Sequence, residues 1–88
     1  MWERKLYGRY HRLIGELARS CGPETDWRRE LRARIDSFEA DANTLDAESA
    51  RLLREELCAQ LEHEALYTAR PLGREILFAA VKWLEADR

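Results

Sequence analysis

The clearest structural signal in this chain of 88 residues lies in residues 2–20, whose sequence is WERKLYGRYHRLIGELARS. Apolar side chains recur there at intervals of three and four, which places them on one arc of an α-helix that turns by about 100° per residue. That arc consists of Trp2, Leu6, Tyr7, Tyr10, Leu13, Ile14, Leu17 and Ala18. Charged residues occupy the other arc, so the segment is predicted to be an amphipathic helix with one buried face.

Three breaks divide the rest of the chain into further helices. Gly22-Pro23 offers a glycine suited to a left-handed helix end and a proline suited to a helix start. Asn43-Thr44 offers a helix end and then an N-cap, with acidic residues following in the next first turn. Arg70-Pro71 interrupts the third segment, because the residue before a proline avoids the α region. The predicted helices therefore span residues 2–20, 24–42, 45–69 and 71–87. The helix at 24–42 has a narrow apolar stripe made of Trp27, Leu31, Ile35, Phe38 and Ala42.

Composition favours helices alone. The chain contains 13 Leu and 12 Ala but one Val, three Ile and three Thr, so residues that suit a helix greatly outnumber the β-branched residues that suit a sheet. The length fits one domain, residues 1–88, near the lower limit for folding around a single core. Because short connections favour antiparallel neighbours, we expect an all-α, up-down antiparallel four-helix bundle. A two-plus-two arrangement completed by a second chain is the alternative.

The predicted helices at 45–69 and 71–87 carry more apolar surface than one bundle face requires. The helix at 45–69 has one stripe made of Leu53, Leu57, Leu61 and Ala65. It has a second stripe, at seven-residue spacing, made of Leu45, Leu52, Ala59 and Leu66. The helix at 71–87 is apolar over more than half of its circumference, and Phe78 lies beyond that arc among charged residues.

This surplus leaves two interpretations open. Either both helices are interior, with the helix at 71–87 covering the second stripe, or the surplus surface meets another chain. Seven-residue spacing suits a partner helix. We therefore expect a homodimer with Leu52 and Leu66 at or near its interface.

Charge and cysteine content limit the environment of the chain. Its net charge of -2 is the sum of a basic part, residues 1–34 at +4, and an acidic part, residues 35–88 at -6, so only the first part is suited to face an anion. Charged residues near the start and the lack of a long apolar run predict a cytoplasmic protein with no membrane contact. In a reducing compartment Cys21 and Cys58 are expected to act as small, partly buried hydrophobic residues.

Known catalytic, metal-binding and phosphate-binding patterns are not found in the sequence. His11 and Cys21 are too far apart along one predicted helix to share a metal ion, and Cys58 and His63 point in opposite directions. The four glycines form no phosphate-binding loop. We therefore expect no catalytic residues, no metal site and no cofactor, and interpret the chain as a protein that is not an enzyme.

Residues 11–15, His-Arg-Leu-Ile-Gly, resemble the H-x-L-K-G signature of histidine phosphotransfer domains, which are themselves four-helix bundles. The resemblance implies an exposed His11 that carries a phosphoryl group and a Gly15 that lets a response regulator approach. Ile14 stands where the family has the lysine that favours a phosphoryl group. The alternative interpretation is a histidine at the edge of the apolar arc with glycines nearby.

Residues 17–22 and 25–31 together resemble a helix-turn-helix, with Ala18 at the fifth motif position and Gly22 at the ninth. The resemblance implies that Arg28, Arg29 and Arg32 lie near the start of a recognition helix and contact DNA. Arg28 stands where that family buries an aliphatic side chain. The alternative interpretation is an ordinary helical hairpin with an arginine-rich face in solvent.

Surplus apolar surface and the lack of a chemical site together favour a protein-binding role. We therefore expect a small regulator, adaptor or inhibitor that binds another protein through Leu45, Leu52, Ala59, Leu66 and Phe78. The alternatives are a DNA-binding regulator and, third, a phosphotransfer domain.

Overall fold

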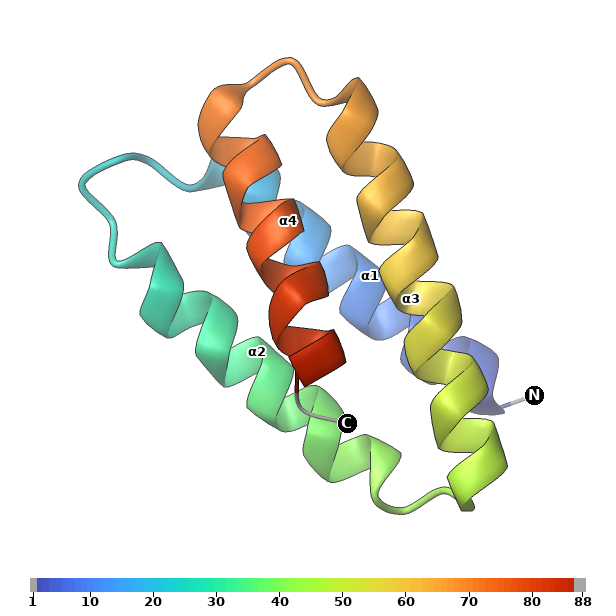
Figure 1. Cartoon of the computed structure of the whole chain (residues 1–88). Helices are drawn as coiled ribbons and strands as arrows, with labels where there is room; N and C mark the ends of the chain where they lie inside the picture. The colour runs from blue at the N-terminus through green and yellow to red at the C-terminus, as the bar shows by residue number, and fades with distance from the viewer. Residues whose placement is uncertain (1, 87–88) are drawn as a thin grey trace.

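Four helices make up the protein in a computed structural model, which describes residues 2–86 and the side chains of residues 4–86. They are α1 (Trp2–Ser20), α2 (Trp27–Ala42), α3 (Ala47–Tyr67) and α4 (Pro71–Ala86). Consecutive helices run in alternating directions (Figure 1). The described residues contain no strand, and the predicted all-α, up-down four-helix bundle is confirmed.

The start of α2 differs from the prediction, because Asp26 and not Pro23 opens the helix. The Asp26 carboxylate accepts a hydrogen bond of 3.4 Å from the backbone N–H of Arg29, as an N-cap does. Gly22 is not in the left-handed conformation, since no described residue has a positive φ. The connection from α1 to α2 is therefore three residues longer than predicted, and Pro23 lies exposed in it.

The start of α3 also moves, from Leu45 to Ala47. Asp46 is the N-cap and accepts the backbone N–H of Ser49 at 2.8 Å. Thr44, the predicted N-cap, instead donates its hydroxyl to the carbonyl oxygen of Asp41 at 2.6 Å, at the end of α2. Asp46 and Thr44 thus bond to different helices, and the chain turns between them.

Helix α1 packs against all three other helices, and so does α4. Helices α2 and α3 follow each other in the chain but contact each other least, because α1 and α4 meet across the centre of the bundle. Gly73 contributes to this arrangement, since it has no side chain and the backbone of α1 at Ala18 lies directly against it. Within the predicted up-down bundle, α1 with α2 and α3 with α4 are therefore closely packed consecutive pairs, whereas α2 and α3 contact each other only weakly.

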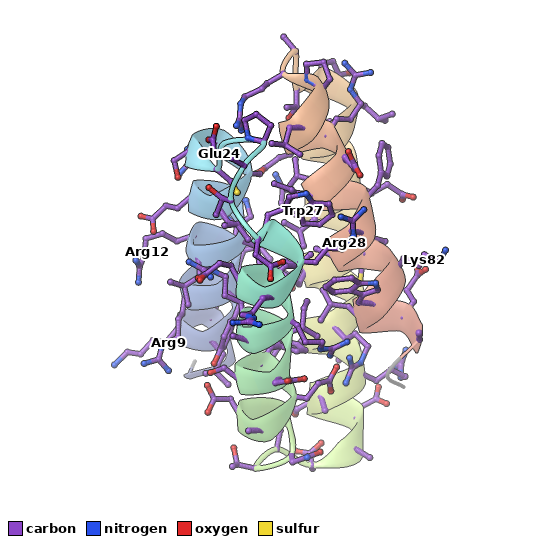
Figure 2. The ribbon with its side chains drawn as sticks, turned by 90° about the vertical axis from the view of Figure 1, so that its left-hand side faces the viewer. Arg9, Arg12, Glu24, Trp27, Arg28 and Lys82 are labelled. Atoms are coloured by element: carbon purple, nitrogen blue, oxygen red, sulfur yellow. The ribbon has the colours of Figure 1, made fainter. Side chains whose placement is uncertain are left out.

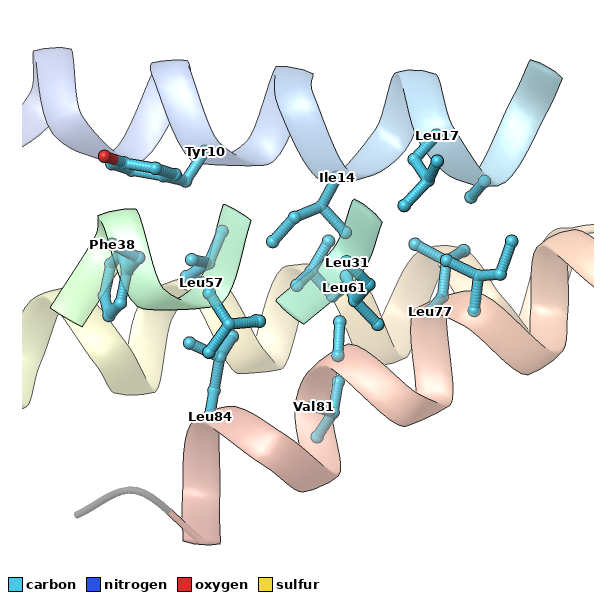
Figure 3. Packing of buried hydrophobic residues seen from close by; sticks show 14 of the residues in the cluster. Tyr10, Ile14, Leu17, Leu31, Phe38, Leu57, Leu61, Leu77, Val81 and Leu84 are labelled. Carbon is cyan, nitrogen blue, oxygen red and sulfur yellow. The ribbon is translucent and has the colours of Figure 1, made fainter. Parts of the chain in front are cut away.

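One hydrophobic core joins the four helices (Figure 3). The predicted stripe of α2 is buried throughout, as is the first predicted stripe of α3. Tyr10 and Phe38 meet edge to face in this core, with ring centroids 5.3 Å apart. Both cysteines are buried as thiols. The predicted contribution of Trp2 lies outside the described side chains.

Most of the wide apolar surface of α4 is buried inside the bundle. Its buried residues are Gly73, Ile76, Leu77, Ala80, Val81 and Leu84. The interpretation of α4 as an interior helix is therefore correct for these residues. Phe78, which is 40% exposed, is the large apolar side chain of α4 that faces outward.

Candidate interaction surfaces

The second stripe of α3 lies on the outside of the bundle. Leu52 is 50% exposed and Leu66 is 69% exposed. Ala59, between them, is also exposed. Leu45, which precedes the helix, is half-buried and packs against the core. The structure thus places Leu52, Ala59 and Leu66, here called the outer stripe, on one open face and separates Leu45 from them.

The helical period explains why no helix of the same chain covers the outer stripe. Leu57 and Leu61 point to the core, and residues at the positions of Leu52, Ala59 and Leu66 project from the opposite side of the helix. Helix α4 packs on the inner side of α3, where Leu77 and Leu84 are buried. The interpretation in which the helix at 71–87 covers the second stripe is therefore wrong.

Phe78 is separate from the outer stripe. It is 40% exposed and belongs to the outward face of α4, one turn from the exposed Arg74 and Lys82. Lys82 points away from the bundle in Figure 2. Charged neighbours on both sides leave Phe78 as an isolated apolar side chain, which is common on protein surfaces.

A groove of about 750 Å³ lies where α1, α3 and α4 come together. Its apolar lining includes Gly15 and Ala18 of α1, Tyr67 of α3 and Leu77 of α4. Arg19 and Arg70 also line the groove, with the guanidinium group of Arg19 beside Gly15 and that of Arg70 on the carbonyl oxygen of Ala18. Sequence reasoning did not find this groove, because three separated segments of the chain, residues 15–19, residues 63–70 and Leu77, form it.

His11 points toward α3 and bonds there to Glu64. Its Nε2 is paired with the Glu64 carboxylate, and Gln60 donates to the same oxygen at 3.2 Å. The ring of Tyr7 stacks on His11 at a centroid distance of 5.7 Å. Burial raises the pKa of Glu64, but the hydrogen bonds from His11 and Gln60 outweigh it and lower that pKa below its ordinary value.

The contact between His11 and Glu64 disfavours the phosphotransfer role that the H-x-L-K-G resemblance implies. A phosphoryl group on Nε2 of His11 would lie against the Glu64 carboxylate, and two negative charges in contact repel each other. The two glycines near His11 also differ from each other, since Gly8 is exposed, whereas Gly15, the glycine of the motif, is buried below Arg19. The geometry favours the alternative interpretation, a histidine at the edge of the apolar arc, and shows in addition that His11 joins α1 to α3.

The three candidate DNA-binding arginines each pair with an acidic side chain. Arg28 lies 3.5 Å from Glu75 and over the ring of Trp27, beside which it lies in Figure 2. Arg29 lies 3.5 Å from Asp26, and Arg32 lies 3.0 Å from Asp36. These pairs are exposed and offset the positive charge that a phosphate would otherwise meet.

Helices α1 and α2 lie side by side and run in opposite directions (Figures 1 and 2). In a helix-turn-helix the two helices cross at about 90–120° and the turn has three or four residues. Here the six residues 21–26 connect the helices. The arrangement is that of a helical hairpin and does not favour the DNA-binding alternative.

Within residues 4–86 no group of three or more His, Cys, Asp or Glu side chains is placed to hold a metal ion. None of the described helices has both the length and the apolar content needed to cross a lipid bilayer. Comparison with models of protein families, with curated proteins and with solved structures finds no significant match for this chain. The candidate surfaces are therefore interpreted from their own chemistry.

Proposed function

We propose that this chain is a protein-interaction module that forms a homodimer through the outer stripe. The observation that supports this most strongly is the exposure of Leu52 and Leu66, at 50% and 69%, on a helix whose other apolar stripe is buried. Large apolar side chains that share one face of a helix are typical of a surface that meets another helix.

The spacing of the outer stripe suits a second copy of this same chain. Leu52 and Leu66 are each seven residues from Ala59, so the stripe has the same order in both directions. In an antiparallel pair centred on Ala59, Leu52 meets the partner's Leu66, and Leu66 meets the partner's Leu52. The small side chain of Ala59 at the centre lets the two helices approach closely.

The expected dimer is weak. Complete burial of a leucine side chain contributes about 1.5–3 kcal/mol, and these leucines have only part of their surface left to bury. A dimer has four such leucines. The free energy gained by burying their remaining surface is close to the lower estimates of the free-energy cost of association, about 4 kcal/mol. The dimer should therefore form in a concentration-dependent way, which suits a module that exchanges partners.

Leu52→Glu tests the proposal, with light scattering and circular dichroism as measurements. The wild type should show a mass that rises with concentration toward that of a dimer, and Leu52→Glu should remain a folded monomer. Ala40→Glu, an exposed alanine on α2 changed to the same residue, should behave like the wild type. A wild type that stays monomeric at every concentration, or a Leu52→Glu dimer, would contradict the proposal.

The regulatory role and the cytoplasmic location belong to the same proposal. The core holds Cys21 and Cys58 as buried thiols rather than as a disulfide, which fits a reducing compartment. A module without a catalytic centre acts by occupying surfaces of other proteins, as regulators and adaptors do.

A further inference from the structure

The groove between α1, α3 and α4 is a second feature, distinct from the outer stripe. Its volume of about 750 Å³ lies within the range of about 300–1,000 Å³ that is typical of small-molecule sites. Ala18 and Leu77 are each 3% exposed and form an apolar floor, and the residues that connect α3 to α4 line one end. A groove of this size and lining accommodates a short hydrocarbon chain or a single ring.

The charged side chains that line the groove differ in whether they already have a bonding partner. The carboxylate of Glu64 is bonded to His11 and Gln60. Arg70 donates to the carbonyl oxygen of Ala18, which keeps its positive charge at the groove. The side chain of Arg19 forms no hydrogen bond or salt bridge with the other described residues, and its charge acts on Glu64 only at longer range. The groove therefore combines an apolar floor with an excess of positive charge.

Gly15 sets the position of the Arg19 side chain. A β-carbon at residue 15 would lie 3.1 Å from Nη1 of Arg19, so the missing side chain lets the guanidinium group lie close against α1. There the group is next to the apolar floor and its N–H groups remain able to donate. Guanidinium groups frequently bind carboxylates by two parallel hydrogen bonds.

We propose that the groove binds a small apolar monocarboxylic acid, whose hydrocarbon part lies on Ala18 and Leu77 and whose carboxylate pairs with Arg19. Apolar contact supplies the attraction and Arg19 selects the anion over a neutral molecule of the same shape. The inference does not depend on the homodimer, because the outer-stripe residues Leu52, Ala59 and Leu66 are not part of the groove lining.

Octanoate is the probe, and 1-octanol, which has the same chain without the charge, is its control. Isothermal titration calorimetry should show saturable binding of one octanoate per chain and at least about fivefold weaker binding of 1-octanol, the effect of one partly exposed charge-assisted hydrogen-bond pair. Equal binding of the two molecules, or no saturable heat with octanoate, would overturn the proposal.

Matched variants locate the site, because α1 has the same pair of residues seven positions earlier, Gly8 and Arg12. Arg19→Glu should weaken octanoate binding by about tenfold or more, whereas Arg12→Glu should bind like the wild type. Gly15→Leu, which places a large side chain below Arg19, should abolish binding, and Gly8→Leu should not. A β-carbon at residue 8 would meet no neighbouring atom within 4 Å, so that control has room.

Circular dichroism shows whether Gly15→Leu still folds. If it does not, Arg19→Glu still tests the site, because Arg19 is exposed and its replacement leaves the core unchanged. Octanoate binding that is unchanged in folded Arg19→Glu would place the molecule elsewhere and reject the site. Leu52→Glu should bind octanoate like the wild type. Failure of the homodimer and failure of this groove are thus measured in separate experiments.

Discussion

The carbonyl oxygen of Ala18 on α1 lies directly against Gly73 on α4. A β-carbon at residue 73 would be 2.7 Å from that oxygen and 3.2 Å from Cγ2 of Thr68. Ala18 lies in the last turn of α1, where backbone carbonyls have no partner within the helix, and Arg70 donates to this one. Helices α1 and α4 therefore meet backbone to backbone at this point.

We expect Gly73→Ala to destabilise the protein although alanine favours a helix. The helix preference contributes up to about 1 kcal/mol, but separating two backbones costs about 1–3 kcal/mol. The net loss in the free energy of unfolding should be about 1–2 kcal/mol, measured by urea denaturation. Gly8→Ala, with open space around it, should stabilise by about 0.5–1 kcal/mol. Gains of equal size in both variants would show that the close approach is absent.

Glu64 should make the free energy of unfolding decrease as the pH falls into the acid range. Its pKa is lower in the folded protein than its ordinary value of 4.5, so its contribution is present above that value and is lost as the pH falls through the folded-state pKa. Glu64→Gln should lower the melting temperature at neutral pH and flatten its decline in acid. Glu62→Gln, exposed on the same helix, should follow the wild type. Parallel acid curves for wild type and Glu64→Gln would contradict this assignment.

Arg54 joins three helices and should matter more than any surface arginine. It is an α3 residue, 11% exposed at its side chain, that pairs with Glu39 of α2 and donates to the carbonyl of Leu84 on α4 at 2.9 Å. Arg54→Met should cost about 2–4 kcal/mol, because Glu39 then loses its partner in a partly buried place.

Two further variants provide the controls for Arg54. Arg51→Met removes an arginine whose acidic partners lie on the same helix and whose side chain is 49% exposed, so its cost should stay below about 1 kcal/mol. Combining Arg54→Met with Glu39→Leu should recover part of the loss, since no buried charge then remains unmatched. Chemical denaturation measures all three, and an equal cost for Arg51→Met and Arg54→Met would reject the argument.

We expect no binding to duplex DNA at physiological salt. The candidate DNA-binding residues Arg28, Arg29 and Arg32 are paired with Glu75, Asp26 and Asp36. Most of the acidic residues lie in the second part of the chain. A mobility-shift titration over a range of salt concentrations measures this. A salt-sensitive shift that disappears when Arg28→Ala and Arg32→Ala are combined would restore the DNA-binding interpretation.

The sequence determined that the chain forms four helices and which face α1 and α2 bury. The five apolar residues of the α2 stripe are the five buried residues of that helix, and the ends of α1 were predicted to the residue. Such agreement follows from the local origin of the signal, because a period of 3.6 residues and a cap depend only on neighbours in the chain. Where two residues competed for the same cap, as Thr44 and Asp46 did, the sequence alone was not sufficient.

The tertiary structure alone decided which apolar surface stayed exposed. The helix at 45–69 and the helix at 71–87 both showed a surplus, yet α4 turned most of its apolar surface inward and α3 left Leu52 and Leu66 outside. The difference depends on how the helices are arranged around the core, with α1 and α4 meeting at Ala18 and Gly73. That contact and the groove beside it join residues more than fifty positions apart. Patterns that repeat over a few residues carry no information about such distances, so only the packed bundle reveals them.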